Sequence, residues 1–237
     1  MMDRKRISTY ILVVISSLLL LPSVASAQRR KPVTTVNEDS IASFRGIAVG
    51  TDVVGPAMRL LANYGQYEAM VRVNIKDRYY PIVEIGVGQA DKTDETTGVR
   101  FKTSAPYARV GVDFNVLKNK HDIYRFLVGG RLGYTSFKYD VTSPGTFDPV
   151  WHVQVPYEAN GVSNNQLWVE AVGGVDAKIW GPLRMGWSVR YKTRLYQKAG
   201  ANGEAWYVPG YGRGGTSRLG ATFNVLLEFW FSPFLKL

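Results

Sequence analysis

The stretch that decides the fold covers residues 218–231 and reads RLGATFNVLLEFWF. Its odd positions are apolar from Leu219 to Phe231, and its even positions are mostly polar or glycine, including Arg218 and Glu228. Strict alternation of this kind is typical of a strand whose two faces meet different surroundings. The stretch is also longer than the roughly 5–6 residues of most strands. Because it lies near the C-terminus, we interpret it as the closing strand of an outer-membrane β-barrel.

Seven earlier segments show a similar period-two pattern. They cover residues 46–54, 67–76, 80–89, 106–117, 123–139, 166–179 and 183–197. The connections alternate between short turns and long loops, and the long loops cover residues 55–66, 90–105, 141–165 and 198–217. Short periplasmic turns and long extracellular loops are the rule in outer-membrane barrels. The pattern therefore predicts an all-β fold, an eight-stranded antiparallel up-and-down transmembrane β-barrel with both termini in the periplasm.

Composition limits the classes of function. The chain has 237 residues, enough for one barrel domain, and it has no cysteine, which excludes a disulfide framework, a thiol nucleophile and a lipoprotein anchor. The formal net charge is +10. We expect acidic lipid head groups or lipopolysaccharide phosphates, and no nucleic acid, as anionic partners of such a chain. No cofactor is expected.

The N-terminal stretch has a basic start, an apolar run and the small residues Ala25 and Ala27. These features predict a Sec signal peptide that is cleaved after Ala27. The predicted organisation is a signal peptide at 1–27, a flexible periplasmic segment at 28–45, the barrel at 46–231 and a short tail at 232–237.

The placement of glycine indicates which face of the strands points inward. Most strand glycines share the charged face, namely Gly46, Gly50, Gly86, Gly88, Gly111, Gly129, Gly133, Gly174, Gly186 and Gly220. A solvent-exposed face has no need of so many glycines, which weaken strands, whereas a crowded interior does. We therefore expect the apolar face to meet lipid. The alternative is a soluble periplasmic barrel of lipocalin type, with its apolar face inside.

With the apolar face outside, the lumen receives the charged residues. An eight-stranded barrel has an interior just wide enough for side chains, and buried charges must be paired or hydrated. We therefore predict a plugged, charged lumen instead of an open pore, with a salt bridge between Arg184 and Glu228. Aromatic residues near strand ends are expected to form the girdles at the membrane interfaces. They are Tyr79, Tyr80, Tyr107, Tyr124, Trp180, Phe229 and Phe231.

Two groups of residues are candidate functional sites. His152 lies in a long loop with Asp148 and Ser143, and enzymes that modify lipid A in the outer membrane use a histidine in such a place. It is our candidate catalytic residue, and an ordinary polar loop residue is the alternative. Arg190, Lys192 and Arg194 follow one another at every second position. They would form an anion site for a sugar phosphate or lipopolysaccharide core, or they would be partners of internal carboxylates. No metal site is expected.

The loop before the last strand is rich in glycine and aromatic residues. Its run at 210–215 has only a loose similarity to a phosphate-binding loop, and it precedes a strand where a P-loop precedes a helix. We expect a flexible loop tip, with Trp206, Tyr207 and Tyr211 available to stack on sugars or insert into a partner.

Taken together, the Ala25–Ala27 leader, the eight alternating segments and the aromatic end from Phe223 to Phe231 resemble small outer-membrane proteins of the OmpA and OmpX type. The chain is more similar to a family of Bacteroidota outer-membrane barrels defined as a domain of unknown function, number 6048, over residues 46–231. One departure is the tail at 232–237, because barrels of this type end on an aromatic residue that the assembly machinery reads. Either Phe231 serves as that residue or the tail joins the signal.

Three hypotheses about function follow. The first is a non-enzymatic outer-membrane barrel with a structural, adhesive or envelope-maintenance role, monomeric in outer-membrane lipid, in contact with lipopolysaccharide and inserted by the barrel-assembly machinery. The second is an outer-membrane enzyme that modifies lipid A or phospholipid through His152. The third is the soluble periplasmic lipocalin-like binding protein.

Overall fold

The structure is a computed structural model that describes residues 43–148, 150–198, 204–214 and 218–230. The predicted signal peptide, most of the segment 28–45, the tail 232–237 and Phe231 lie outside these residues.

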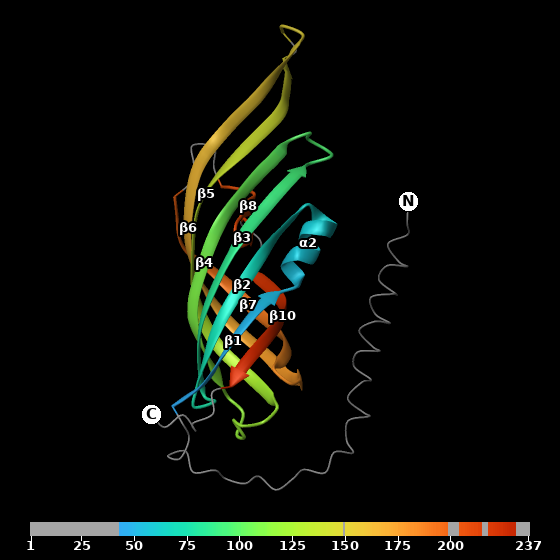
Figure 1. The fold of residues 1–237 in the computed structure, drawn as a ribbon. Helices are drawn as coiled ribbons and strands as arrows, with labels where there is room; N and C mark the ends of the chain where they lie inside the picture. The colour runs from blue at the N-terminus through green and yellow to red at the C-terminus, as the bar shows by residue number, and fades with distance from the viewer. Residues whose placement is uncertain (1–42, 149, 199–203, 215–217, 231–237) are drawn as a thin grey trace, which may run out of the picture. The chain divides into compact units, whose positions relative to one another are not determined.

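Eight long strands form a closed antiparallel barrel (Figure 1). They are β1 (Phe44–Asp52), β2 (Tyr64–Ile75), β3 (Tyr79–Thr93), β4 (Arg100–Asn115), β5 (Tyr124–Asp148), β6 (Val153–Trp180), β7 (Leu183–Lys198) and β10 (Leu219–Trp230). Each strand pairs with its neighbours in the order β1-β10-β7-β6-β5-β4-β3-β2. The last strand closes on the first, from Gly46 opposite Trp230 to Asp52 opposite Asn224. The predicted eight-stranded up-and-down barrel is confirmed.

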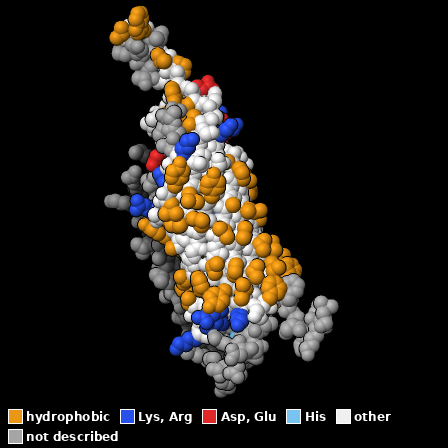
Figure 2. All heavy atoms as spheres, turned by 90° about the vertical axis from the view of Figure 1, so that its left-hand side faces the viewer, with side chains coloured by type: hydrophobic (Ala, Val, Ile, Leu, Met, Phe, Trp, Pro, Cys, Tyr) orange, Lys and Arg blue, Asp and Glu red, His pale blue; other side chains and the backbone are white. Residues whose placement is uncertain are grey.

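Apolar side chains lie on the outside of the barrel and charged side chains on the inside. In β10, Leu227 and Phe229 are 45% and 52% exposed, whereas Glu228 between them is 2% exposed. Figure 2 shows apolar side chains spread over the middle of one face, with lysine and arginine side chains gathered near its lower end. A lipocalin has the opposite arrangement, because its apolar residues line the interior. The arrangement is that of a transmembrane barrel.

The glycines are placed where the interior is crowded, as the sequence predicted. A Cβ at Gly133 would lie 2.3 Å from the Trp168 indole, and one at Gly88 would lie 2.6 Å from the Cα of Pro209. Gly173 lies on the outer face, and nothing lies within 4 Å of its would-be Cβ. The large indole of Trp168 therefore fits inside an eight-stranded barrel because the strand beside it carries no side chain at Gly133.

The prediction of a loop at 141–165 is wrong, because β5 and β6 continue as a long hairpin that extends past the other strands (Figure 1). Pro144, Gly145 and Gly161 interrupt the alternation in this stretch. The ladder absorbs the interruption through register shifts between Tyr139 and Val141 and again after Ser143, with Gly145 at φ +90°. Bulges of this kind preserve strand pairing but break the period-two alternation from which strands are predicted.

The segment after β1, predicted as part of a loop, contains a helix, α2 (Val54–Ala62). Asp52, the last residue of β1, stabilises its first turn, because its carboxylate accepts hydrogen bonds from the backbone N–H groups of Val54 and Gly55 at 3.1 and 2.8 Å. Asn63, in the left-handed conformation at φ 58°, ends it. No helix in the described part of the chain is long and apolar enough to cross a membrane.

The predicted aromatic girdle is partly wrong. Tyr79, Tyr124, Trp180 and Phe229 are exposed on the outer surface as expected. Tyr80 and Tyr107 are buried inside the barrel instead. Their parity along the strand places them on the charged face. The lumen thus contains aromatic side chains as well as charges. The girdle was predicted from closeness to strand ends, and this criterion does not distinguish the inner face of a strand from the outer one.

Candidate functional site

A network of six buried arginines and six buried carboxylates lines the inner wall of the barrel. All twelve side chains belong to residues that are at most 6% exposed. The arginines are Arg72, Arg109, Arg125, Arg131, Arg184 and Arg190, and the carboxylates are Glu68, Glu84, Asp113, Glu170, Asp176 and Glu228. Six positive and six negative charges cancel, so these twelve side chains together carry no formal net charge. Burial of so many charges is tolerable only when each has a partner.

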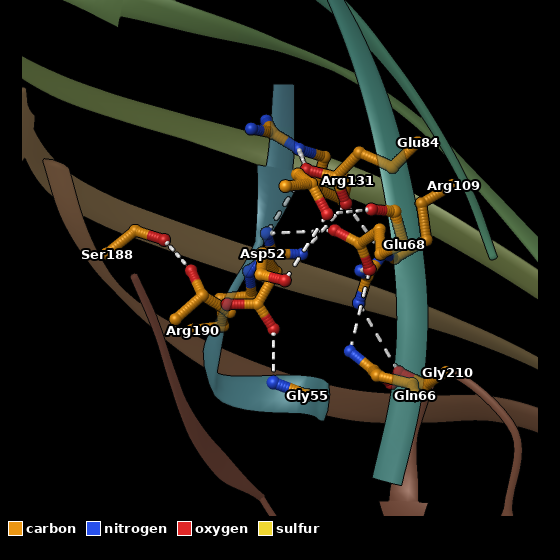
Figure 3. Close-up of polar contacts among 12 residues, drawn as sticks. Asp52, Gly55, Gln66, Glu68, Glu84, Arg109, Arg131, Ser188, Arg190 and Gly210 are labelled. Carbon is orange, nitrogen blue, oxygen red and sulfur yellow. Dashed lines mark hydrogen bonds and ion pairs between the residues drawn. The ribbon is translucent and has the colours of Figure 1, made fainter. Parts of the chain in front are cut away.

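Glu84 is the centre of the half of the network nearer the long loops (Figure 3). Its carboxylate lies 2.7 Å from Nε of Arg109, 2.8 Å from Nη1 of Arg190 and 3.3 Å from Nε of Arg131. Glu68 also pairs with Arg109, and it accepts a hydrogen bond of 2.6 Å from the Tyr107 hydroxyl. Three arginines from three strands therefore share one carboxylate, which ties opposite walls of the barrel together.

The half nearer the short turns is built around Asp176 and Glu228. Asp176 lies 2.6 Å from Nη2 of Arg184 and 2.9 Å from Nη1 of Arg72. Glu228 lies 2.9 Å from Nη2 of Arg125 and 3.4 Å from Nη1 of Arg184. The structure thus brings together Arg184 and Glu228, the pair expected from the sequence, and gives each of them a second partner.

The two halves form one continuous network. Arg131 connects them through Asp113, because its Nε faces Glu84 and its Nη1 lies 2.7 Å from Asp113, which in turn lies 3.6 Å from Nη2 of Arg72. The cavity enclosed between the halves has a volume of about 20 Å³. A space of that size holds about one water molecule. The charged side chains therefore leave little space for water in this cavity.

A second element packs against the inner side of the barrel wall beside this network, and we call it the plug loop (residues 204–214). It contains β8 (Tyr207–Val208) and β9 (Gly212–Arg213), which pair with each other. Tyr207, Val208 and Tyr211 are buried in a cluster that contains barrel aromatic residues. These barrel residues are Phe101, Tyr107, Phe137, Tyr139 and Trp168. The expectation of a flexible loop tip at 210–215 is therefore wrong for its described residues.

Polar contacts fix the plug loop to the barrel wall. The Tyr207 hydroxyl donates to the carbonyl of Gly65 at 2.8 Å, and Nη1 of Arg109 donates to the carbonyl of Gly210 at 3.3 Å. Nζ of Lys192 donates to the carbonyl of Tyr211. Tyr207 and Tyr211 therefore point into their own barrel and are not available to a partner. The density of aromatic residues in this loop was the signal that could have indicated burial.

The three basic residues of the candidate anion site are engaged with groups of the protein itself. Arg190 pairs with Glu84 and Glu170, and Lys192 contacts the plug loop. Nη1 of Arg194 lies 2.6 Å from Oε1 of Glu204, near the barrel mouth. Arg190 thus has the internal carboxylate partners of the alternative interpretation, whereas Arg194 pairs with an exposed carboxylate.

His152 lies at the exposed tip of the β5–β6 hairpin, with φ 50°. Ser143 pairs across the hairpin with Tyr157, and Asp148 with Val153. Tyr157 and Val153 are four residues apart, which is about 14 Å at roughly 3.4 Å per residue. The Ser143 hydroxyl instead accepts a hydrogen bond from the N–H of Gly145. The pairing of Ser143 with Tyr157 therefore separates Ser143 from the hairpin tip that carries His152. The side chain of Asp148 lies outside the described part of the chain.

The second histidine, His121, lies in the short turn after β4, with its Nδ1 2.7 Å from Oδ2 of Asp77. Within the described ranges, no three His, Asp or Glu side chains are placed to hold a metal ion.

We expect Glu84→Gln to lower the free energy of unfolding by about 3–5 kcal/mol, because it removes the charge that three buried arginines share. Unfolding by guanidinium in lipid vesicles, followed by tryptophan fluorescence, measures the change. Glu95→Gln is the matched control, since Glu95 is exposed in the β3–β4 loop. Equal stability of the Glu84 variant and the wild type would contradict the network described above.

We expect Gly210→Ala to displace the plug loop. Gly210 has φ +78°, and a Cβ there would lie 2.5 Å from the Tyr107 ring. Gly161→Ala is the matched control, because Gly161 has φ +66° with nothing within 4 Å of its would-be Cβ. Both substitutions carry the backbone strain, and only the first adds a clash. Amide hydrogen exchange at residues 205–211 should accelerate at least tenfold in Gly210→Ala alone; similar exchange in both variants would show that the contact with Tyr107 does not hold the loop.

Three comparisons with known proteins relate the chain to others. No curated protein matches it. Neisserial surface protein A (NspA), in its crystal structure, is 11% identical with a TM-score of 0.37, over 79% of this chain and 98% of that chain. Ail, the attachment invasion locus protein of Yersinia pestis, in complex with the heparin analogue sucrose octasulfate, is 8% identical with a TM-score of 0.36, over 80% and 99%. The family model described as "Domain of unknown function (DUF6048)" matches residues 7–237, and the protein belongs to that family.

Proposed function

We propose that this protein is a non-enzymatic, non-conducting barrel of the bacterial outer membrane, which displays its long loops at the cell surface in a structural, adhesive or envelope-maintenance role. The observation that supports the proposal is the network of buried, paired charges in the lumen. Twelve paired charges fill the barrel, and the plug loop covers them. A barrel sealed in this way offers its outer wall and its exposed ends to partners.

The exterior supports placement in a membrane. Only closed barrels and helices satisfy their backbone hydrogen bonds in lipid, and this barrel is closed. Its three short turns lie at one end, between β2 and β3, β4 and β5, and β6 and β7. With that end in the periplasm, both termini lie there too. The partners we propose are outer-membrane lipid, including lipopolysaccharide, and the barrel-assembly machinery during insertion, with the protein as a monomer.

The display surface is the β5–β6 hairpin. Val150 and Trp151 at its tip are both 76% exposed, and Tyr157 is 47% exposed. Exposed apolar and aromatic side chains of this kind are typical of surfaces that bind other macromolecules. A hairpin that extends past the rest of the barrel can reach a partner beyond the polar head groups, which supports an adhesive role.

The enzymatic alternative has no geometric support in the described residues. Among them, His152 has no catalytic serine beside it, and the lumen carboxylates are held in ion pairs with arginine. We therefore favour the non-enzymatic role, which a test for surface display can examine directly.

Labelling of single cysteines tests the display and the orientation together, because the natural chain has no cysteine. Glu158→Cys places a thiol on the hairpin, and Lys118→Cys places one in the short turn after β4. In intact cells a membrane-impermeant maleimide should label Glu158→Cys at least tenfold more than Lys118→Cys, and lysis should equalise them. The reverse pattern would show that the hairpin faces the periplasm. Recovery of the labelled protein in the soluble fraction would contradict the placement of the barrel in the membrane.

A further inference from the structure

A pocket of about 470 Å³ opens at the barrel mouth between the β3–β4 loop, the β4–β5 wall and the plug loop. Pockets that bind small molecules have volumes of roughly 300–1,000 Å³. It lies at the end of the barrel that carries the long loops, separate from the sealed lumen. None of the roles considered above uses it.

Aromatic side chains form one wall of the pocket. Phe101 and Tyr139 stack with their ring centroids 5.3 Å apart, and Trp206 of the plug loop lies 5.9 Å from Phe101. Tyr64 holds Trp206 from another side with an edge-to-face contact at 5.6 Å. Rings that support one another in this way form a preorganised surface, so a ligand does not have to order them on binding.

Two cations lie beside this wall. Nζ of Lys92 is 5.8 Å from the centroid of the Trp206 ring, and Cζ of Arg213 is 5.7 Å from it. In the described part of the chain, neither Lys92 nor Arg213 is in an ion pair. Both are exposed, and both line the pocket. Their charges are therefore available to an anionic group that enters it.

The two carboxylates of the pocket are already partly engaged. Oε1 of Glu204 lies 2.6 Å from Arg194. Oδ1 of Asp94 accepts hydrogen bonds from the N–H groups of Thr97 and Thr96, and the bond from the Thr97 backbone lowers the pKa of Asp94. Within the described residues, Oδ2 of Asp94 and Oε2 of Glu204 receive no hydrogen bond. The pocket thus offers two cations, two spare acceptor atoms and an aromatic wall.

We propose that this pocket binds a saccharide unit that carries an acidic group, such as a uronic acid. The acidic group would lie between Lys92 and Arg213. The C–H face of the sugar ring would pack on Trp206, the partly exposed ring of the aromatic wall, and its hydroxyls would donate to the spare oxygens of Asp94 and Glu204. An inorganic anion lacks the apolar face, and a neutral sugar lacks the charge. This inference adds a ligand class to the proposed function. It rests on that function in one respect, which is that the pocket opens at the cell surface.

Isothermal titration calorimetry on the full-length protein in detergent, with galacturonic acid as the probe, tests the proposal. We expect saturable binding of galacturonic acid, with galactose and inorganic phosphate each at least tenfold weaker. Phosphate binding as tightly as galacturonic acid would reduce the pocket to a simple anion site and overturn the proposal. Absence of saturable binding by galacturonic acid would overturn it as well.

Variants connect the binding to the pocket. The double substitution Lys92→Gln with Arg213→Gln should weaken galacturonic acid binding at least tenfold, and so should Trp206→Phe, which removes the indole but retains an aromatic ring. Lys102→Gln is the matched control, since Lys102 is an exposed cation of β4 that does not line the pocket. Each variant is first checked for the compact, heat-modifiable form on a gel. A well-folded double variant that binds like the wild type would contradict the assignment.

The acidic sugar could belong to a glycan of the same cell or to one from outside. Competition by lipopolysaccharide purified from the producing strain would assign the first source, and binding of galacturonic acid without such competition would assign the second. Both results require the pocket to bind the acidic sugar and therefore support the proposal. Binding in detergent does not depend on how the barrel is oriented in a membrane. Absence of binding would therefore contradict the pocket alone, whereas a contrary labelling pattern would contradict the proposed surface display.

Discussion

The pairing of six buried arginines with six buried carboxylates is the interaction on which the rest of the structure depends. An eight-stranded barrel in lipid must present apolar residues outward, so its polar residues have only a narrow interior to occupy. Isolated charges in that interior would cost several kcal/mol each. The structure meets this constraint by sharing partners: Glu84 contacts three arginines, and Arg131 joins the two halves of the network. The glycines of the inner face provide the space that these long side chains and Trp168 require.

The plug loop also fills the narrow interior with side chains that contact one another, but it uses aromatic rings instead of charges. It packs buried aromatic residues against the barrel wall, and it connects to the charges through Arg109, whose guanidinium also contacts the carbonyl of Gly210. Charge network and plug loop are therefore one assembly. The surfaces that we propose for recognition lie outside this assembly: the β5–β6 hairpin and the pocket at the mouth, where Trp206 of the plug loop meets Phe101 of the barrel wall.

Much of this architecture could be predicted from the sequence because it is local and periodic. Alternation in residues 218–231 predicts a strand with an outer and an inner face, and parity along the strands places Arg184 and Glu228 on the same face. The plug loop, α2 and the mouth pocket could not be predicted, since each depends on contacts between segments distant in sequence. Tyr207, for example, donates to the carbonyl of Gly65, which is 142 residues away. The continuation of β5 was hidden because Pro144 and Gly145 interrupt the alternation that a bulged ladder tolerates.

The central claim is that the lumen is sealed by its own charges, independently of the plug loop. Single-channel recording in planar lipid bilayers tests it most directly, with the wild type and a variant in which residues 204–214 are replaced by a short glycine–serine linker. The account predicts that neither protein conducts ions, because the network below the plug loop encloses only about 20 Å³. Stable channels in the variant would show that the plug loop alone closes the barrel, and stable channels in the wild type would contradict a sealed lumen altogether.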